Sequence, residues 1–117
     1  MERARLEAHL ITFRGAEASY PFGPEALVYK VRGKLFALVS QDGNPSVTLK
    51  CVPEDGELLV GQFEAVKPGY HMNKRHWLTI TLSGDVPDEM LLGLAEDSYR
   101  LVVKGLPRAV RAELEAP

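Results

Sequence analysis

Two short, mostly apolar segments joined by Arg32-Gly33 constrain the fold of this chain more than any other feature. Leu27–Val31 and Lys34–Ser40 have the length and apolar character of strands. A two-residue loop that ends in glycine predicts a tight hairpin between these strands. The loop length also predicts the register, with three facing pairs: Val31 with Lys34, Tyr29 with Phe36, and Leu27 with Leu38.

The other elements follow from hydrophobic periodicity and from turn residues. We expect helices over Glu2–Phe13, from Pro53 to about Phe63, and from Asp85 to Lys104, with a short helical or frayed tail over Arg108–Pro117. We expect strands over Ala18–Tyr20, Ser46–Cys51 and His76–Leu82, and a loop or extended segment over Val66–Arg75. Short connections require antiparallel pairing. The order predicts an α+β fold, a two-layer sandwich in which the two longer helices cover one face of an antiparallel sheet.

Composition limits the class of protein. The 117 residues fit one domain over positions 1–117, and 45% hydrophobic and 26% charged residues are ordinary for a globular protein. A net charge of -2 excludes a protein that coats nucleic acid by bulk charge. A single cysteine excludes a disulfide framework and a cysteine-based zinc site. No apolar run is long enough for an export signal or a membrane span, so we expect a cytoplasmic protein without a membrane partner.

Charge is unevenly distributed along the chain, and one basic segment also carries aromatic residues. Positions 65–84 contain no acidic residue, whereas Lys67, Lys74 and Arg75 lie there together with Tyr70 and Trp77. Basic side chains contact phosphates, and tyrosine or tryptophan provides a stacking surface for bases. The segment therefore predicts a nucleic-acid or anion contact. The alternative is a solvated basic loop with Trp77 anchored in a small core.

Strand alternation places Trp77 on a definite face of the sheet. If Leu78, Ile80 and Leu82 face the helices, then Trp77, Thr79 and Thr81 face the other way. Thr48, Lys50 and Lys30 are expected on that same face. Such a face is typical of a stacking platform, and equally typical of a lysine stem that lies over an aromatic ring without further function.

The hairpin tip carries Lys30, Arg32 and Lys34. A basic β-ribbon can enter a nucleic-acid groove. Charged residues also protect an exposed hairpin from edge-to-edge aggregation, and we favour this second interpretation.

No motif indicates catalysis or a metal. His9, His71, His76 and Cys51 lack the local pairing of zinc ligands, and Cys51 is expected on the core side of its strand. The acidic residues at positions 85–97 fit the start of a helix, where the macrodipole favours negative charge. We therefore predict a protein that is not an enzyme and has no cofactor.

Five segments together resemble the MmcQ/YjbR family. They are Tyr20–Pro24, Val28–Ala37, Val47–Lys50, Pro68–Trp77 and Ser98–Val102, in the same order from about Gly15 to Leu106. The resemblance implies a small bacterial protein with an α+β fold similar to type III secretion chaperones. It also implies a suggested DNA-binding role through two β-hairpin wings, which here would be Leu27–Ser40 and Val66–Leu82. It supplies no catalytic residues.

The sequence thus predicts DNA or other nucleic-acid binding through a basic and aromatic sheet face and hairpins. The expected contact residues are Lys30, Arg32, Lys34, Lys50, Lys67, Tyr70, His71, Asn73, Lys74, Arg75, His76 and Trp77. The alternative is a protein-interaction or chaperone-like module that binds a protein partner or a second copy of itself as a homodimer.

Overall fold

The computed structural model describes residues 1–69 and 72–116. Its helices are α1 (Arg3–Leu10), α2 (Pro53–Gln62), α3 (Asp88–Lys104) and α4 (Arg108–Glu115). Its strands are β1 (Ala16–Ser19), β2 (Ala26–Val31), β3 (Lys34–Ser40), β4 (Ser46–Lys50), β5 (Val66–Pro68) and β6 (Trp77–Thr81).

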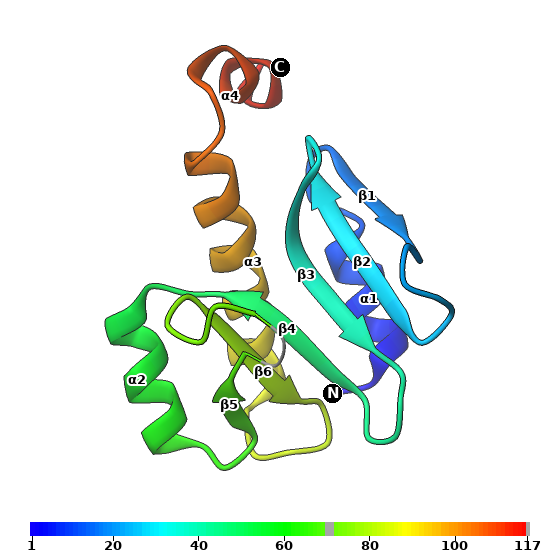
Figure 1. Ribbon diagram of the computed structural model, residues 1–117, viewed down its shortest axis with the longest axis vertical. Coiled ribbons are helices and arrows are strands. Elements are labelled where there is room, and N and C mark those ends of the chain that lie inside the picture. The colour runs from blue at the N-terminus through cyan, green and yellow to red at the C-terminus, as the bar shows by residue number, and fades with distance from the viewer. Residues whose placement is uncertain (70–71, 117) are drawn as a thin grey trace.

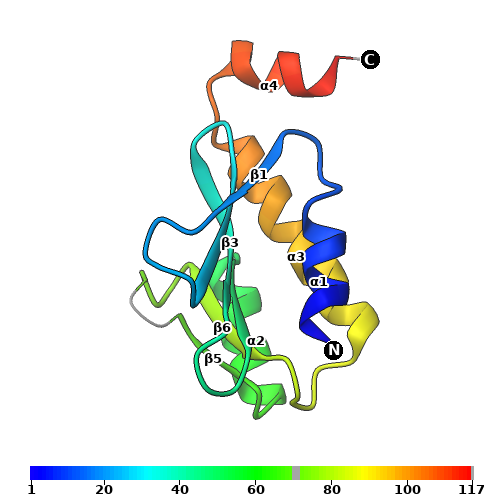
Figure 2. The same ribbon diagram turned by 90° about the vertical axis from the view of Figure 1, so that its right-hand side faces the viewer.

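The strands form one antiparallel six-stranded sheet in the order β1-β2-β3-β4-β6-β5 (Figure 1). Seen edge-on, the sheet has α1 and α3 on one side, whereas the β1–β2 loop projects from the other side (Figure 2). We call these the covered face and the open face. The predicted α+β two-layer sandwich is confirmed, including the face that the two predicted long helices cover.

The β2–β3 hairpin has the predicted turn but not the predicted register beyond it. Arg32 and Gly33 both have positive φ, as a type I′ turn requires, and Val31 faces Lys34. A β-bulge then shifts the pairing by one residue, so Tyr29 faces Ala37 and Leu27 faces Val39. The predicted Tyr29–Phe36 and Leu27–Leu38 pairs were therefore wrong.

The bulge lets two adjacent residues of β3 be buried together. Phe36 and Ala37 are both fully buried. The ring of Phe36 packs against the rings of Phe13, Tyr29 and Tyr99, with centroids 5.3 to 6.3 Å away. This aromatic cluster joins the sheet to α3 and to the segment after α1.

Ser98 of α3 compensates for the backbone pairing that the bulge disturbs. Its hydroxyl accepts a hydrogen bond from the Lys50 N–H at 2.8 Å and donates one to the Phe36 carbonyl. Ser98 is fully buried, so both backbone groups are satisfied away from water. This bridge ties α3 to β3 and β4 at one point.

Several predicted boundaries differ from the structure. The segment after α2 includes the short strand β5, which the Pro68-Gly69 pair obscured in the sequence. Helix α3 begins at Asp88 rather than Asp85, because Asp85 accepts hydrogen bonds from the backbone N–H groups of Glu64 and Ala65. These bonds lower the pKa of the Asp85 carboxyl.

The C-terminal tail is a helix that contacts Gly15 and one residue of the hairpin tip. Leu114 of α4 is buried, and its side chain lies against Gly15, which leaves no room for a Cβ at that position. The Arg32 guanidinium lies 3.9 Å from the Glu113 carboxylate. In the part of the chain that the structure describes, none of the helices has the length and apolar character needed to cross a bilayer.

Candidate nucleic-acid interface

The open face carries the predicted stacking residue and three lysines. Strand register aligns Glu17, Lys30 and Leu35 in one row across β1, β2 and β3, and it pairs Lys50 with Trp77 across β4 and β6. The adjacent row contains Thr48, Thr79 and Lys67. The prediction that Trp77, Thr79, Thr81, Thr48, Lys50 and Lys30 share one face is therefore confirmed.

Trp77 is the centre of this surface. It is half-buried, and the Lys50 ammonium lies 6.0 Å from the centroid of its indole. Gly69 N–H donates to the Trp77 carbonyl at 2.7 Å, and a Cβ on Gly69 would lie only 2.6 Å from the Trp77 Cβ. Glycine at position 69 therefore permits the close backbone approach that holds the indole in place.

The centre of the open face is drier than its polar residues suggest. Thr48 is 5% exposed and Val28 is fully buried, although the sequence assigned Thr48 to a wet side. The Thr48 and Thr79 hydroxyls are 3.0 Å apart and share a hydrogen bond. Long lysine stems and the indole surround these positions, and such side chains cover apolar area while their charged ends stay in water.

The remaining predicted contact residues do not all converge on Trp77. Lys74 and Arg75 lie beside α2, where they line a second, smaller pocket with Glu57 and Val60. The Lys74 ammonium donates to the Gly69 carbonyl at 3.3 Å, and Asn73 accepts from the Arg75 N–H. His76 donates its backbone N–H to the Asn73 carbonyl. These residues form a turn next to the open face rather than a part of it.

The hairpin tip is separate again. Arg32 is engaged by Glu113 of α4, and Lys34 is exposed at the far end of the sheet from the β5–β6 turn. The predicted residues Tyr70 and His71 lie outside the described residues. Of the two predicted wings, the hairpin has one tip cation, Arg32, paired with α4, while its tip residues stay exposed.

The lone cysteine lies on the covered side. Burial raises the pKa of the Cys51 thiol, and the nearby Asp55 carboxylate raises it further. A thiol that stays protonated is a poor nucleophile, so Cys51 has the environment of a core residue.

A protein-family model named YjbR matches residues 11–101 of this sequence. The match includes the whole sheet, α2 and most of α3. The chain belongs to the YjbR family. It is 41% identical over 93 residues to the Escherichia coli O157:H7 uncharacterized protein YbdF, covering 79% of this chain and 76% of that one. It is also 41% identical to the uncharacterized protein YjbR of Escherichia coli K12, over 83% of both chains.

Solved structures show the same fold. A Deinococcus radiodurans crystal structure superposes with a TM-score of 0.88 at 37% identity, covering 97% of this chain and 88% of that one. A Pseudomonas syringae crystal structure gives a TM-score of 0.77 at 25% identity, covering 86% and 98%. The predicted family is thus confirmed. Membership in the YjbR family identifies the fold and leaves the function to be argued from the surface.

Sequence reasoning missed three positions that shape this surface. Gly69 was read only as a chain breaker, Thr48 as a solvated residue, and Ser98 as part of a family motif. Each acts through a partner distant in sequence, namely Trp77, Thr79 and the backbone of Phe36 and Lys50. The one signal of these contacts in the sequence was Gly69, which directly follows a proline and lies eight positions before Trp77.

Proposed function

We propose that this YjbR-family protein binds single-stranded nucleic acid on its open face and catalyses no reaction there. The observation that carries the proposal is the half-buried Trp77 indole beside the Lys50 ammonium, on a sheet face that also carries Lys30. An indole on a sheet surface stacks on an unpaired base, and the lysines contact the neighbouring phosphates. We place this binding in the cytoplasm, where the lone buried thiol of Cys51 stays reduced.

Single strands fit this surface better than a duplex. A duplex is read by a protruding helix or ribbon that enters a groove. The β2–β3 hairpin is less suited to that role, because Glu113 of α4 lies 3.9 Å from Arg32, one of the basic residues at its tip. A sheet face with a stacking side chain instead requires bases that are splayed out of a helix.

The test is fluorescence anisotropy with labelled single-stranded DNA, single-stranded RNA and duplex DNA at low salt. Trp77→Ala should weaken single-strand binding by about 5- to 150-fold, the range for loss of one base–aromatic stack. Lys50→Met and Lys30→Met should each reduce the slope of log affinity against log salt by about 0.7.

Lys34→Met is the matched control, because it removes the same charge at the hairpin tip and should leave affinity and slope unchanged. Tight duplex binding that depends on Lys34 would move the interface to the hairpin. No binding of any of the three nucleic acids by the wild-type chain at low salt would refute the proposal.

A protein-binding role is the second candidate, and the β1–β2 loop favours it. Phe22 is 75% exposed and Tyr20 is 50% exposed in this loop, which projects from the open face (Figure 2). Exposed aromatic residues are common at protein interfaces. If they mediate homodimer formation, sedimentation velocity will show a concentration-dependent dimer that Phe22→Ser abolishes, and a wild-type monomer at all concentrations would exclude it.

A further inference from the structure

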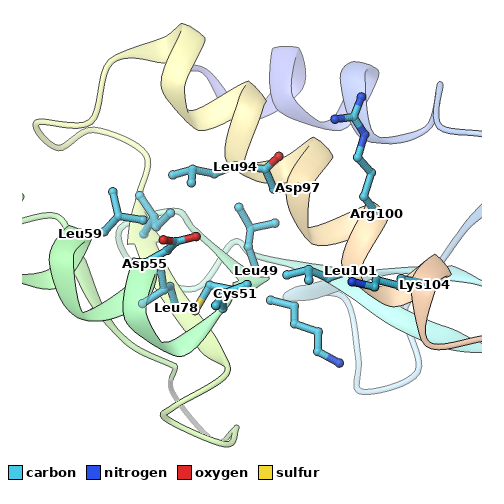
Figure 3. Close-up of a pocket in the computed structure, with 13 residues that line it drawn as sticks. Leu49, Cys51, Asp55, Leu59, Leu78, Leu94, Asp97, Arg100, Leu101 and Lys104 are labelled. Atoms are coloured by element: carbon cyan, nitrogen blue, oxygen red, sulfur yellow. The ribbon is translucent and has the colours of Figure 1, made fainter.

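A groove lies between α2 and α3 on the covered face, on the opposite side of the sheet from Trp77 (Figure 3). Its volume is about 350 Å³, within the range of sites that bind small organic molecules. Leu49, Leu78 and Ile80 of the sheet line its floor, and Leu59, Leu94 and Leu101 line its walls. The interior is therefore aliphatic and is built from the sheet, α2 and α3.

Acidic and basic side chains lie at different positions along this groove. Leu94, Asp97, Leu101 and Lys104 are spaced three, four and three residues apart, which places them along one face of α3. Helical rise separates Asp97 from Lys104 by about 10 Å along the axis. Figure 3 shows the Asp55 carboxylate on the α2 side of the groove, Asp97 on α3 across from it and Lys104 toward the C-terminal end of α3, whereas the Arg100 side chain extends away from the groove.

Three of these charges lack an ionic partner. Arg100 pairs with Glu96, one turn earlier on α3. Across residues 1–69 and 72–116, Asp55, Asp97 and Lys104 take part in none of the salt bridges. Two carboxylates thus line an aliphatic groove from α2 and α3, the Lys104 ammonium lies toward its far end, and Lys50 of β4 adds a further cation to the lining.

The geometry points to a binding site for a short apolar peptide with free ends. Its ammonium would lie between Asp55 and Asp97, its aliphatic side chains on the leucine floor, and its carboxylate beside Lys104. An extended chain spans at most about 3.6 Å per residue, so a tripeptide matches the axial separation of Asp97 and Lys104. The groove lies on the other face of the sheet from Trp77, although Lys50, whose ammonium lies over the Trp77 indole, is also among its lining residues. The inference does not rest on the proposed nucleic-acid binding.

The probe is the tripeptide Leu-Ala-Leu, titrated into the full ¹⁵N-labelled chain and followed by amide chemical shifts. Binding should shift the resonances of Leu49, Leu94 and Leu101, while the resonances of Lys30 and Thr79 on the open face stay in place. Asp97→Asn and Lys104→Met should each weaken binding about three- to fivefold, as expected for ion pairs at an exposed rim. Asp42→Asn, in the β3–β4 turn, is the charge-matched control and should have no effect.

Blocking one end of the peptide at a time tests which end Asp97 contacts and which end Lys104 contacts. N-acetylation should remove the effect of Asp97→Asn without changing that of Lys104→Met, and C-terminal amidation should do the reverse. Leu101→Trp should fill the groove and abolish binding, and the surface variants Asp97→Asn and Lys104→Met test the site even if that variant fails to fold.

Two outcomes would overturn the inference. One is the absence of groove shifts at millimolar peptide, and the other is equal binding of the free and doubly blocked peptides. The second result would mean that the groove accepts an apolar segment of a larger partner without reading its ends.

Discussion

The two faces of the sheet reach similar burial by different means. On the covered face, Phe36, Val39 and Val47 are fully buried because α1 and α3 pack over them. On the open face, Val28 is fully buried and Thr48 is 5% exposed with no helix above them. At Thr48, the neighbouring long side chains of Lys50 and Trp77 on the same face help to exclude water.

Aromatic residues also differ between the faces. On the covered face, Phe13, Phe36 and Tyr99 contact one another with ring centroids 5.1 to 5.9 Å apart. On the open face, Trp77 has a lysine as its ring partner. The rings of the covered face are part of the core or pack against it, whereas the indole is half-buried on the open face.

The largest expected effect contrasts two neighbours on opposite faces. Phe36→Ala should lower the free energy of unfolding by about 3–5 kcal/mol, because it leaves a cavity in the aromatic cluster. Leu35→Ala, on the open face, should cost less than about 2 kcal/mol, because Leu35 is only half-buried. Urea denaturation of both variants measures the difference, and equal costs would mean that the open face is covered in solution.

Ser98→Ala tests the bridge between the helical layer and the sheet. It leaves the Phe36 carbonyl and the Lys50 N–H without their partner, so unfolding should become easier by about 1–3 kcal/mol. Ser19→Ala in the exposed edge strand is the control and should stay within about 0.5 kcal/mol. A neutral Ser98→Ala would show that the bulge does not depend on α3.

A reciprocal exchange on β4 sharpens the contrast between the faces. Val47→Thr places a hydroxyl in the aliphatic covered face and should cost about 1–3 kcal/mol. Thr48→Val removes the hydrogen bond to Thr79 but keeps the side-chain shape, and should cost about 1 kcal/mol or less. Denaturation midpoints at one pH compare the two, and the opposite ranking would contradict the assignment of the dry apolar side.

The smallest effect on the free energy of unfolding is expected at Asp85, which lies just before α3. Asp85 binds the N–H groups of Glu64 and Ala65, and these bonds hold its pKa below the ordinary value of 3.8. A depressed carboxyl pKa adds stability above the pKa of the unfolded chain, and this stability is lost as pH falls through the folded pKa. Asp85→Ala should therefore be less stable than wild type at neutral pH, and the gap should close below about pH 4. A gap that stays constant at low pH would rule out this role.

Much of the sheet could be predicted from local patterns, because turns and strand faces depend on residues that are neighbours in the sequence. The Arg32-Gly33 turn, the faces of β4 and β6 and the buried Cys51 follow from turn chemistry and alternation. The register beyond the turn was not predictable, because the bulge at Phe36 depends on a hydroxyl from Ser98, far along the chain. Strand β5 was missed for a similar reason, since its pairing with β6 outweighs the local effect of Pro68.

The candidate site was also predictable only in part from the sequence. Alternation placed Trp77, Lys50 and Lys30 on one face, and the structure confirms that placement. It did not separate these residues from Lys74, Arg75 and Arg32, because proximity in sequence says nothing about which helix packs beside a loop. The groove between α2 and α3 also depends on packing, although the helical spacing of its charged wall was present in the sequence.

The sequence by itself therefore determined the α+β class, the hairpin turn and the polarity of each strand face. These properties rest on backbone dihedral preferences and on a two-residue period. The tertiary structure decided the bulge, the burial of Thr48, the pairing of α4 with the hairpin tip and the groove beside α3. Each of these requires groups far apart in the chain to meet, and their packing and hydrogen bonds exist only once the layers have assembled.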